Sequence, residues 1–387
     1  MFTTRQIHSR KDKLAFVRML WDIYADDPNW VPPMEMDRMK LIDEKKNPFY
    51  EHSDAAFFIA EENGKIIGRI AAIINHNHNR VHNDKVGFFG FFECIDRSEV
   101  AQALFSEAEK YLRDRGMTSV RGPYNPSAND EAGLLVEGFD RPPVLLMTYN
   151  PPYYIKLIEE CGYAKVMDLY AWLLSTATAR SEKLIRVTKA LQERSQVTIR
   201  PFNRSKFSEE VGKIKALYNA AWEMNWGFVP MTDKEFDALA KDLKPVYDPD
   251  LIFFAEKDGE TIGFSLSIPD MNQAFHGRAD SQSAQGLRVP ATIPRGIMNL
   301  PISLWNLFTK KKKIDTLRIL VLGIDKAYRS LGIDAMLYNA TIEAAAKKGF
   351  TYGEASWVLE NNDPMNRACE MMNGKRYKTY RVYEKGL

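Results

Sequence analysis

The stretch from Leu317 to Tyr338 (LRILVLGIDKAYRSLGIDAMLY) restricts the fold more than any other part of the chain. Its first seven residues are almost all apolar and predict a buried strand, and the residues after Gly332 predict a helix that ends at Gly349. The first N–H groups of a helix lack partners within it, and the helix dipole adds partial positive charge there. A loop with glycine between strand and helix therefore predicts a phosphate site, to which Arg329 adds a positive charge.

In this context Arg329-x-x-Gly332-x-Asp334 resembles the diphosphate loop of the GNAT acyltransferase superfamily, whose usual form is Gln/Arg-x-x-Gly-x-Gly/Ala. Asp334 departs from this pattern, and its carboxylate either caps the helix or repels a diphosphate. After the next strand, Asn361 or Asn362 matches a position that often contacts coenzyme A in the family, although the run Asn361-Asn362-Asp363-Pro364 is also an ordinary turn and helix cap. The resemblance implies that coenzyme A is held by the loop residues and by backbone groups of the strand, which are Leu322, Gly323, Ile324, Arg329, Ser330, Leu331, Gly332, Ile333, Asp334 and Ala335.

Length and composition predict a two-domain, water-soluble protein. The chain has 387 residues, more than one core usually holds, and 27% of them are charged. The formal net charge of +2 gives no indication of nucleic-acid binding. Three widely spaced cysteines, no leader-like segment and no apolar run approaching ~20 residues predict a cytoplasmic protein without an integral membrane segment.

An internal repeat accounts for the two domains. Residues 254–263 (FAEKDGETIG) align with residues 59–68 (IAEENGKIIG) at a constant offset, and both read as a strand, a turn and a strand. Each half then continues with a strand, a long helix, a strand, a short helix and a strand, which is also the element order of GNAT domains. The sequence therefore predicts an α/β fold, a mixed sheet with helices on both faces, in two GNAT-like domains at 1–175 and 197–387 with a linker helix in 176–196.

The two halves differ at the loop. In the first half the strand Val86–Cys94 continues into Ile95-Asp96-Arg97-Ser98-Glu99, which has no Arg-x-x-Gly. Glu93, Asp96 and Glu99 place negative charge where a diphosphate would sit. We therefore expect one coenzyme A site, in the second half, and a degenerate first copy.

Glu354 is the candidate general base, because it is the only acidic side chain in the strand Tyr352–Leu359. Ser356 shares its face by alternation and is expected to hydrogen-bond the substrate. The alternative is a glutamate at the rim or in a salt bridge. The family often has a tyrosine acid four residues before the glycine of the last helix, where this chain has Glu370, so no general acid is assigned; we expect packing roles for Tyr377, Tyr380 and Tyr383.

Two segments are candidates for the acceptor site. Trp222, Asn225 and Trp226 lie at the position of the first GNAT helix and its loop, which commonly contacts acceptors in the family. Asn125 and Asn129 lie in a long loop rich in amides. Core packing and turn chemistry are the respective alternatives.

Two further segments carry weaker predictions. The histidines His76, His78 and His82 are more consistent with a solvated loop than with a metal site, because no acidic or cysteine ligands accompany them. The insertion from Met271 to Lys313 is expected to form a lid or short helices, and its run LPISLWNLF followed by four lysines is a candidate interfacial helix.

Together these features predict a CoA-dependent N-acyltransferase. It would move an acyl group, acetyl or longer, from acetyl-CoA or another acyl-CoA to a small-molecule or peptide amine. The site is expected in the C-terminal domain, facing the cleft between the domains. The alternatives are a non-catalytic acyl-CoA-binding or interaction module and an aminoacyl-tRNA-dependent peptidyl transferase of related fold.

Overall fold

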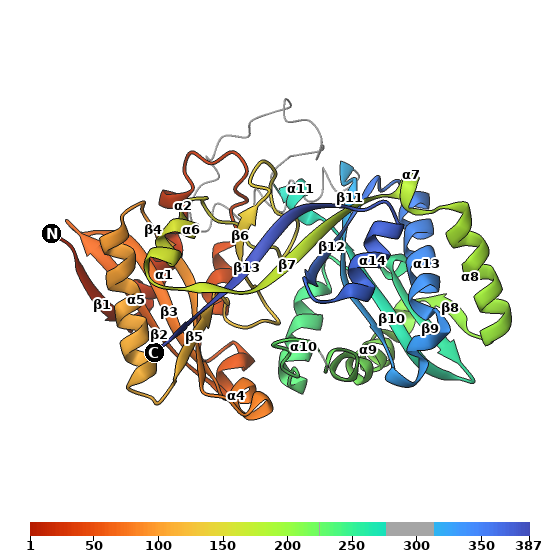
Figure 1. The fold of residues 1–387 in the computed structure, drawn as a ribbon, viewed down its shortest axis with the longest axis horizontal. Coiled ribbons are helices and arrows are strands. Elements are labelled where there is room, and N and C mark those ends of the chain that lie inside the picture. The colour runs from red at the N-terminus through yellow and green to blue at the C-terminus, as the bar shows by residue number, and fades with distance from the viewer. Residues whose placement is uncertain (224, 276–312) are drawn as a thin grey trace. The chain divides into compact units, whose positions relative to one another are not determined.

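The chain forms two compact units, each built around its own part of a β-sheet (Figure 1). The structure is a computed structural model that describes residues 1–223, 225–275 and 313–387. Unit 1 contains Met1–Leu169 and Lys378–Leu387, and unit 2 contains the described residues between them. The α/β fold class predicted from the sequence is confirmed. Two strands pass from one unit into the other: β7 (Ala164–Ser175) leaves unit 1 after Leu169, and β13 (Lys375–Gly386) enters it at Lys378.

The sheet of unit 1 has the strand order β1-β2-β3-β4-β5-β13, and β6 pairs with β13. Besides β7 and β13, its elements are β1 (Thr3–Ile7), α1 (Arg10–Arg18), α2 (Leu20–Ile23), α3 (Glu35–Leu41), η1 (Pro48–Glu51), β2 (Ser53–Glu62), β3 (Lys65–Asn75), α4 (His76–His82), β4 (Val86–Cys94), α5 (Ser98–Arg113), β5 (Ser119–Gly122), β6 (Leu134–Glu137) and α6 (Tyr154–Glu160).

The sheet of unit 2 has the order β12-β11-β10-β9-β8, with β7 beside β12. Its elements are α7 (Thr176–Ala179), α8 (Glu182–Ser195), β8 (Thr198–Pro201), η2 (Arg204–Lys206), α9 (Phe207–Trp222), α10 (Asp233–Leu243), η3 (Pro249–Leu251), β9 (Ile252–Lys257), β10 (Glu260–Pro269), α11 (Met271–Phe275), β11 (Thr316–Ile324), η6 (Lys326–Leu331), α13 (Ile333–Lys347), β12 (Tyr352–Leu359) and α14 (Asp363–Met371).

The internal repeat is visible in the backbone. The hairpin β2–β3 turns at Asn63 and Gly64, with φ of 50° and 74°, and the hairpin β9–β10 turns at Asp258 and Gly259, with φ of 52° and 83°. Two successive positive φ angles define the tight turn that matches strand twist, which explains the Asn-Gly and Asp-Gly pairs. Both second strands also have a bulge just after the turn.

Each unit contains two parallel strands whose ladder pairing ends partway along. In unit 1 the pairing of β4 with β5 ends at Phe88 and Arg121, and in unit 2 the pairing of β11 with β12 ends at Ile319 and Ala355. A bulge lies on β11 at Leu320, directly beyond its last pair with β12. Bulges bend a strand and increase its twist, so this one turns β11 away from β12. We call the divergence of β11 and β12 the fork.

Helices cover both faces of the sheet in unit 2. A Cβ placed at Gly323 on β11 would meet Ala221 and Trp222 of α9 at 2.9 and 3.2 Å. On the opposite face, Ile333, Met336 and Leu337 of α13 are buried against β9 and β10 (Figure 1). In unit 1, α5 is buried through its apolar face, with Leu104 and Leu112 filling the space over Gly68 and Gly87.

One local prediction in the first half is wrong. Residues His76–His82 form helix α4 and not a loop, because Asn75 caps the helix by accepting a hydrogen bond from the His78 N–H. His78 is buried, and burial lowers its pKa to about 3, so its ring is neutral. The N-cap of α5 is Arg97, and the hydroxyl of the next residue, Ser98, donates to Glu160.

Most of the predicted insertion, residues 276–312, lies outside the described residues, together with its candidate interfacial helix. Within the described residues, no helix combines the length and the apolar character that a bilayer span requires. These residues also contain no group of three or more potential metal ligands.

Candidate active site

A buried polar cluster lies where the strands of the fork separate. Arg318 of β11 and Glu354 of β12 occupy matched positions in the last part of the parallel pairing. The Ser356 hydroxyl donates to Glu354 Oε1 at 2.6 Å and accepts from Arg318 Nε at 3.2 Å. The Tyr377 hydroxyl donates to Glu354 Oε2. Both carboxylate oxygens of Glu354 are therefore held in a fixed orientation.

Burial makes this cluster unusual. Glu354 is 0% exposed and Arg318 is 2% exposed. Isolated charges of this kind are costly to bury, so the guanidinium and the carboxylate are most stable when both are present. Arg318 also donates to the Ser356 carbonyl at 3.3 Å and stacks over the Trp357 ring at 5.1 Å. Ser356 therefore lies beside the predicted base and orients its carboxylate, and its contact with the substrate stays a prediction.

The predicted phosphate loop has the backbone that the sequence implies. Gly332 has φ of 68° and is the N-cap of α13, so a side chain at this position would be strained. The N–H groups of Ile333, Asp334 and Ala335 form the first turn of α13, where a helix has no internal acceptors. From the linker helix α8, Leu191 packs over Gly332, with Cδ1 2.6 Å from where a Cβ would lie.

The two charged residues of the loop have distinct environments. Arg329 donates to the Ala221 carbonyl in the last turn of α9 at 2.9 Å and to the Ile324 carbonyl at 3.4 Å. Its cation therefore lies at the negative end of the α9 dipole. Asp334 is the second residue of α13 and not its cap, since that position is held by Gly332. Its carboxylate lies at the positive end of the α13 dipole, where a diphosphate would also bind.

Beyond the fork, one edge of β11 is available for a further chain. Leu322, Gly323 and Ile324 pair with β10 on one side. Within the described residues, no strand pairs with the other side of β11 after Ile319. An extended arm carrying amide groups can add to such an edge as an extra strand does.

The corresponding edge in unit 1 is closed by the chain itself. Tyr124 donates its N–H to the Phe89 carbonyl at 2.9 Å, and Asn125 Oδ1 accepts from the Phe91 N–H at 2.6 Å. At Gly90 there is no room for a Cβ, because the Tyr124 carbonyl oxygen occupies that place. Farther along, the Cys94 N–H donates to the Tyr154 hydroxyl at 2.9 Å. An added arm would need the same backbone groups of β4, which are already hydrogen-bonded within unit 1.

Unit 1 also places a buried acid beside its closed edge. Glu93 accepts hydrogen bonds from the hydroxyls of Tyr24 and Tyr154 at 2.9 and 2.7 Å and lies 3.5 Å from the Arg69 guanidinium. Burial raises the pKa of Glu93 in spite of Arg69. Of the two predicted amides, Asn125 also donates to Glu131, and Asn129 lies in the turn that begins at Ser127.

The predicted aromatic segment lies at the end of α9. Trp222 packs against Tyr218 and Phe264, and its ring lies 3.2 Å from the Cβ position of Gly323. Asn225 and Trp226 follow it and are half-buried, and the Asn225 N–H donates to the Trp222 carbonyl. This end of α9 therefore lies over β11 beyond the fork.

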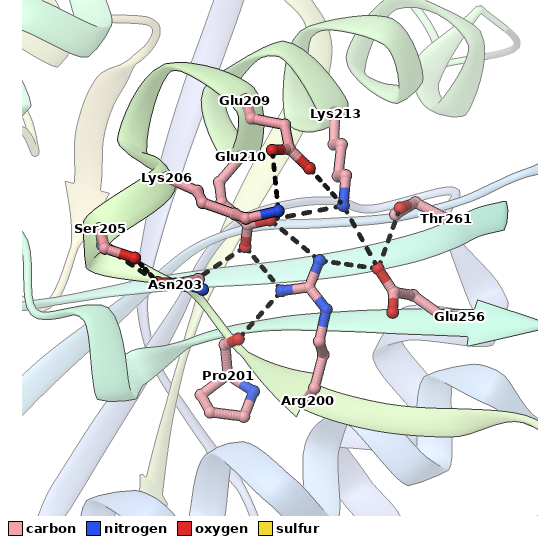
Figure 2. A network of polar contacts seen from close by, with 10 residues as sticks. All are labelled: Arg200, Pro201, Asn203, Ser205, Lys206, Glu209, Glu210, Lys213, Glu256 and Thr261. Atoms are coloured by element: carbon pink, nitrogen blue, oxygen red, sulfur yellow. Dashed lines mark hydrogen bonds and ion pairs between the residues drawn. The ribbon is translucent and has the colours of Figure 1, made fainter. Parts of the chain in front are cut away.

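An ion network fastens the other end of α9 to the sheet (Figure 2). Arg200 of β8 binds both carboxylate oxygens of Glu210 at 2.6 and 3.0 Å and also binds Glu256 at 2.7 Å. Lys213, one turn after Glu210, lies 3.4 Å from Glu210 and 3.5 Å from Glu256. The network fixes the helix whose far end contacts Arg329 and Gly323.

The remaining predicted residue, Asn361, is exposed in the turn between β12 and α14. Its neighbour Asn362 caps α14, with Oδ1 accepting from the Met365 N–H at 3.3 Å. The structure also identifies two residues that were not predicted as members of the site. Arg318 lies in an apolar strand and Tyr377 precedes a buried lysine, so only their positions beside Glu354 indicate a role.

Comparison with known proteins gives two relatives over nearly the full chain. Protein YghO of Escherichia coli is 34% identical over 387 residues, covering 99% of this chain and 95% of that protein. The bacterial ceramide synthase of Caulobacter vibrioides is 37% identical over 378 residues, covering 96% of this chain and 94% of that protein. No family model matches the sequence.

Solved structures show the same fold at low identity. A tandem GNAT protein from the clavulanic acid biosynthesis pathway has a TM-score of 0.56 and 9% identity, covering 100% of this chain and 98% of its own. A GCN5-related N-acetyltransferase from Sphaerobacter thermophilus has a TM-score of 0.53 and 12% identity, covering 100% and 95%. At these identities the likeness concerns the fold alone.

Proposed function

Because this chain belongs to one family with Protein YghO and the bacterial ceramide synthase and shares its fold with a tandem GNAT protein, we propose that it transfers an acyl group from acyl-CoA to an amine at the fork of unit 2. The observation that carries the proposal is the fork itself. It combines an available strand edge, a glycine-capped helix N-terminus and a buried carboxylate within one unit.

The backbone of unit 2 fits the parts of a CoA thioester. The N–H groups at the start of α13 suit a diphosphate, and the edge of β11 suits the amide groups of the pantetheine arm. Acyl-CoA would supply an activated thioester carbonyl. The closed edge of β4 in unit 1 supports a single site per chain, since an arm there would displace Tyr124 and Asn125.

The cluster at the fork supplies a base and an acid. Glu354 accepts the proton that the amine nitrogen loses when it forms the C–N bond with the thioester carbonyl carbon. As the C–S bond breaks, the Tyr377 hydroxyl donates a proton to the departing sulfur. The hydrogen bond from Tyr377 to Glu354 then returns the proton from the carboxyl group to the tyrosine. Proton and bond counts balance, and both groups end as they began.

The acceptor is proposed from the named relative. A ceramide is the amide of a fatty acid with a long-chain amino alcohol, and a relative at 37% identity carries that product in its name. We extend this to a long acyl group and a long-chain amino alcohol for the present chain. Acetyl transfer to a small amine is the second candidate, because the fold is shared with N-acetyltransferases.

The test is a turnover assay with a matched inactive variant. The purified protein is incubated with acetyl-CoA or palmitoyl-CoA and with sphinganine or a panel of small amines. Release of CoA thiol and the mass of the amide are then recorded. We expect amide from palmitoyl-CoA and sphinganine, and none with Glu354→Gln. Binding of acyl-CoA without amide from any pair would instead indicate a non-catalytic module.

A further inference from the structure

The middle of β11 has an unusual pattern of burial for a strand inside a sheet. Thr316, Leu317 and Arg318 are buried, and so are Gly323 and Ile324 at the other end. Between them Ile319, Leu320, Val321 and Leu322 are all partly exposed, and all four are apolar. Ile319 and Val321 pack against clusters on opposite faces of the sheet, so solvent reaches both faces at the fork.

Because of the bulge at Leu320, Ile319 and Leu322 lie on one face of the sheet and Val321 lies on the other. Ile319 and Leu322 both pack against the cluster that contains Tyr338 and Ile342 of α13 and Val358 of β12. Val321 instead packs against the cluster of α9, with Ile214 and Leu217. Without the extra residue, strict alternation would place Ile319 and Leu322 on opposite faces.

The two faces differ in chemistry beside the fork. Ala355 belongs to the cluster under α13, so its neighbours Glu354 and Ser356 face the α9 side, as does Arg318. That side offers a carboxylate, a hydroxyl and a guanidinium. The α13 side offers partly buried apolar surface from β11 and α14, contributed by Ile319, Leu322 and Met365.

We propose that the acyl tail lies on the α13 side of the fork, against Ile319, Leu322 and Met365, while the amine approaches Glu354 from the α9 side. This placement rests on the proposed acyl transfer and adds to it the residues that select chain length. A hydrocarbon tail on the α13 side removes apolar surface from water without desolvating a charge. The amine meets the side on which the carboxylate of Glu354 lies.

The placement predicts that affinity rises with acyl length. Each buried methylene contributes about 0.8 kcal/mol, or roughly fourfold in affinity, so even a few buried methylenes give a large preference. Decanoyl-CoA is therefore expected to bind at least ~10-fold more tightly than acetyl-CoA. On this side the Tyr338 hydroxyl donates to Met365 Sδ at 3.0 Å.

The experiment measures dissociation constants of acetyl-CoA and decanoyl-CoA by titration calorimetry. Met365→Trp fills the α13 side, and we expect it to abolish the preference for decanoyl-CoA while changing acetyl-CoA affinity by less than about twofold. Met371→Trp is the matched control, because Met371 lies on the same helix and is 73% exposed. Val321→Leu, on the α9 side, is expected to keep the preference as well.

The outcomes separate this placement from the proposed function. Equal affinity for the two thioesters in the wild-type protein, or a preference that Met365→Trp leaves intact, overturns the placement alone. Absence of binding by every CoA thioester overturns the acyl transfer and the placement together. If Met365→Trp does not fold, Leu322→Ser replaces it, since it adds no bulk and is expected to lower the preference at least ~5-fold.

Discussion

Tyr377 and Glu354 are 23 residues apart in the sequence, yet the Tyr377 hydroxyl donates a hydrogen bond directly to the Glu354 carboxylate. Tyr377 is on β13, and Glu354 is on β12 at the fork. The proton acceptor Glu354 and the proton donor Tyr377 are therefore in direct contact. In the proposed reaction, each group restores the protonation state of the other.

Removal of the Tyr377 hydroxyl tests this relation. Tyr377→Phe is expected to lower kcat by about 10²-fold with little change in KM for acyl-CoA, since the phenol acts only when sulfur departs. Tyr383→Phe is the control, because Tyr383 lies on the same strand and its hydroxyl also donates to a glutamate, Glu159. Steady-state kinetics should leave the control within about twofold of wild type. Equal losses in both variants would assign Tyr377 a structural role.

The left-handed backbone at Gly332 predicts a loss of CoA affinity on substitution. Gly332→Ala adds a strain of about 1–3 kcal/mol and a clash with Leu191, so the Kd for CoA should rise at least ~5-fold. Gly349→Ala provides the comparison, because Gly349 also has a positive φ, 86°, but ends α13 at the far side with nothing within 4 Å. A similar Kd for wild type and both variants in calorimetry would exclude the loop as the diphosphate site.

The carboxylate of Asp334 is expected to oppose the diphosphate. Asp334→Asn keeps the shape and removes one charge, so CoA should bind about fivefold more tightly at low salt. The gain should shrink in ~1 M salt, where the Debye length is near 3 Å. The same variant should lose about 0.3–1 kcal/mol of stability, because Asp334 complements the α13 dipole. Weaker CoA binding by the variant would contradict the repulsion.

The Arg200 network predicts a pH-dependent contribution to stability. Burial alone raises the pKa of Glu210, but the bonds from Arg200 and from the Asn203 N–H hold it below its ordinary 4.5. Arg200 likewise lowers the pKa of Glu256. Two depressed carboxyl pKa values stabilise the fold above pH ~4.5, and this contribution is lost as the pH falls through the folded-state pKa values.

Arg200→Met tests that contribution. It leaves the buried Glu210 carboxylate without its main partner, and the free energy of unfolding at pH 7 should fall by about 2–4 kcal/mol. The difference from wild type should narrow at pH 3, as urea denaturation at both pH values would show. Lys206→Met, an exposed member of the same network that contacts Glu209, should cost less than about 0.5 kcal/mol. An equal loss at both pH values would rule out linkage to the carboxylates.

Much of the fold followed from local sequence chemistry. The Asn-Gly and Asp-Gly turns marked the repeated hairpins, the strands Val86–Cys94 and Tyr352–Leu359 have the predicted bounds, and Gly332 has the predicted conformation. These features depend on residues close together in the chain. Periodicity and turn preference therefore suffice to find them.

The rest of the site depends on residues that are distant in the chain. We expected Tyr377 to be a packing residue, because its neighbours in the sequence do not indicate that it contacts Glu354. The role of Arg318 could not be predicted either, because its partner Ser356 lies on another strand. The sequence predicted from charge and from the missing Arg-x-x-Gly that the first half holds no coenzyme A site, whereas the closure of the β4 edge depends on contacts of Tyr124 and Asn125. A side-chain contact between two strands leaves no pattern in the sequence around either residue, so it could not be predicted.

The path of β13 has a consequence for how the protein is made. Its residues after Tyr377 pair with β5 and β6, and the buried Lys378 ammonium is held by the carbonyls of Gly138 and Arg141 at 2.6 and 2.7 Å. Unit 1 is therefore assembled from opposite ends of the sequence. During translation the β5 edge therefore stays unpaired until β13 has left the ribosome. An unpaired strand edge can pair with other chains. We therefore expect chaperones that shield strand edges to stay bound to the nascent chain until β13 has been made.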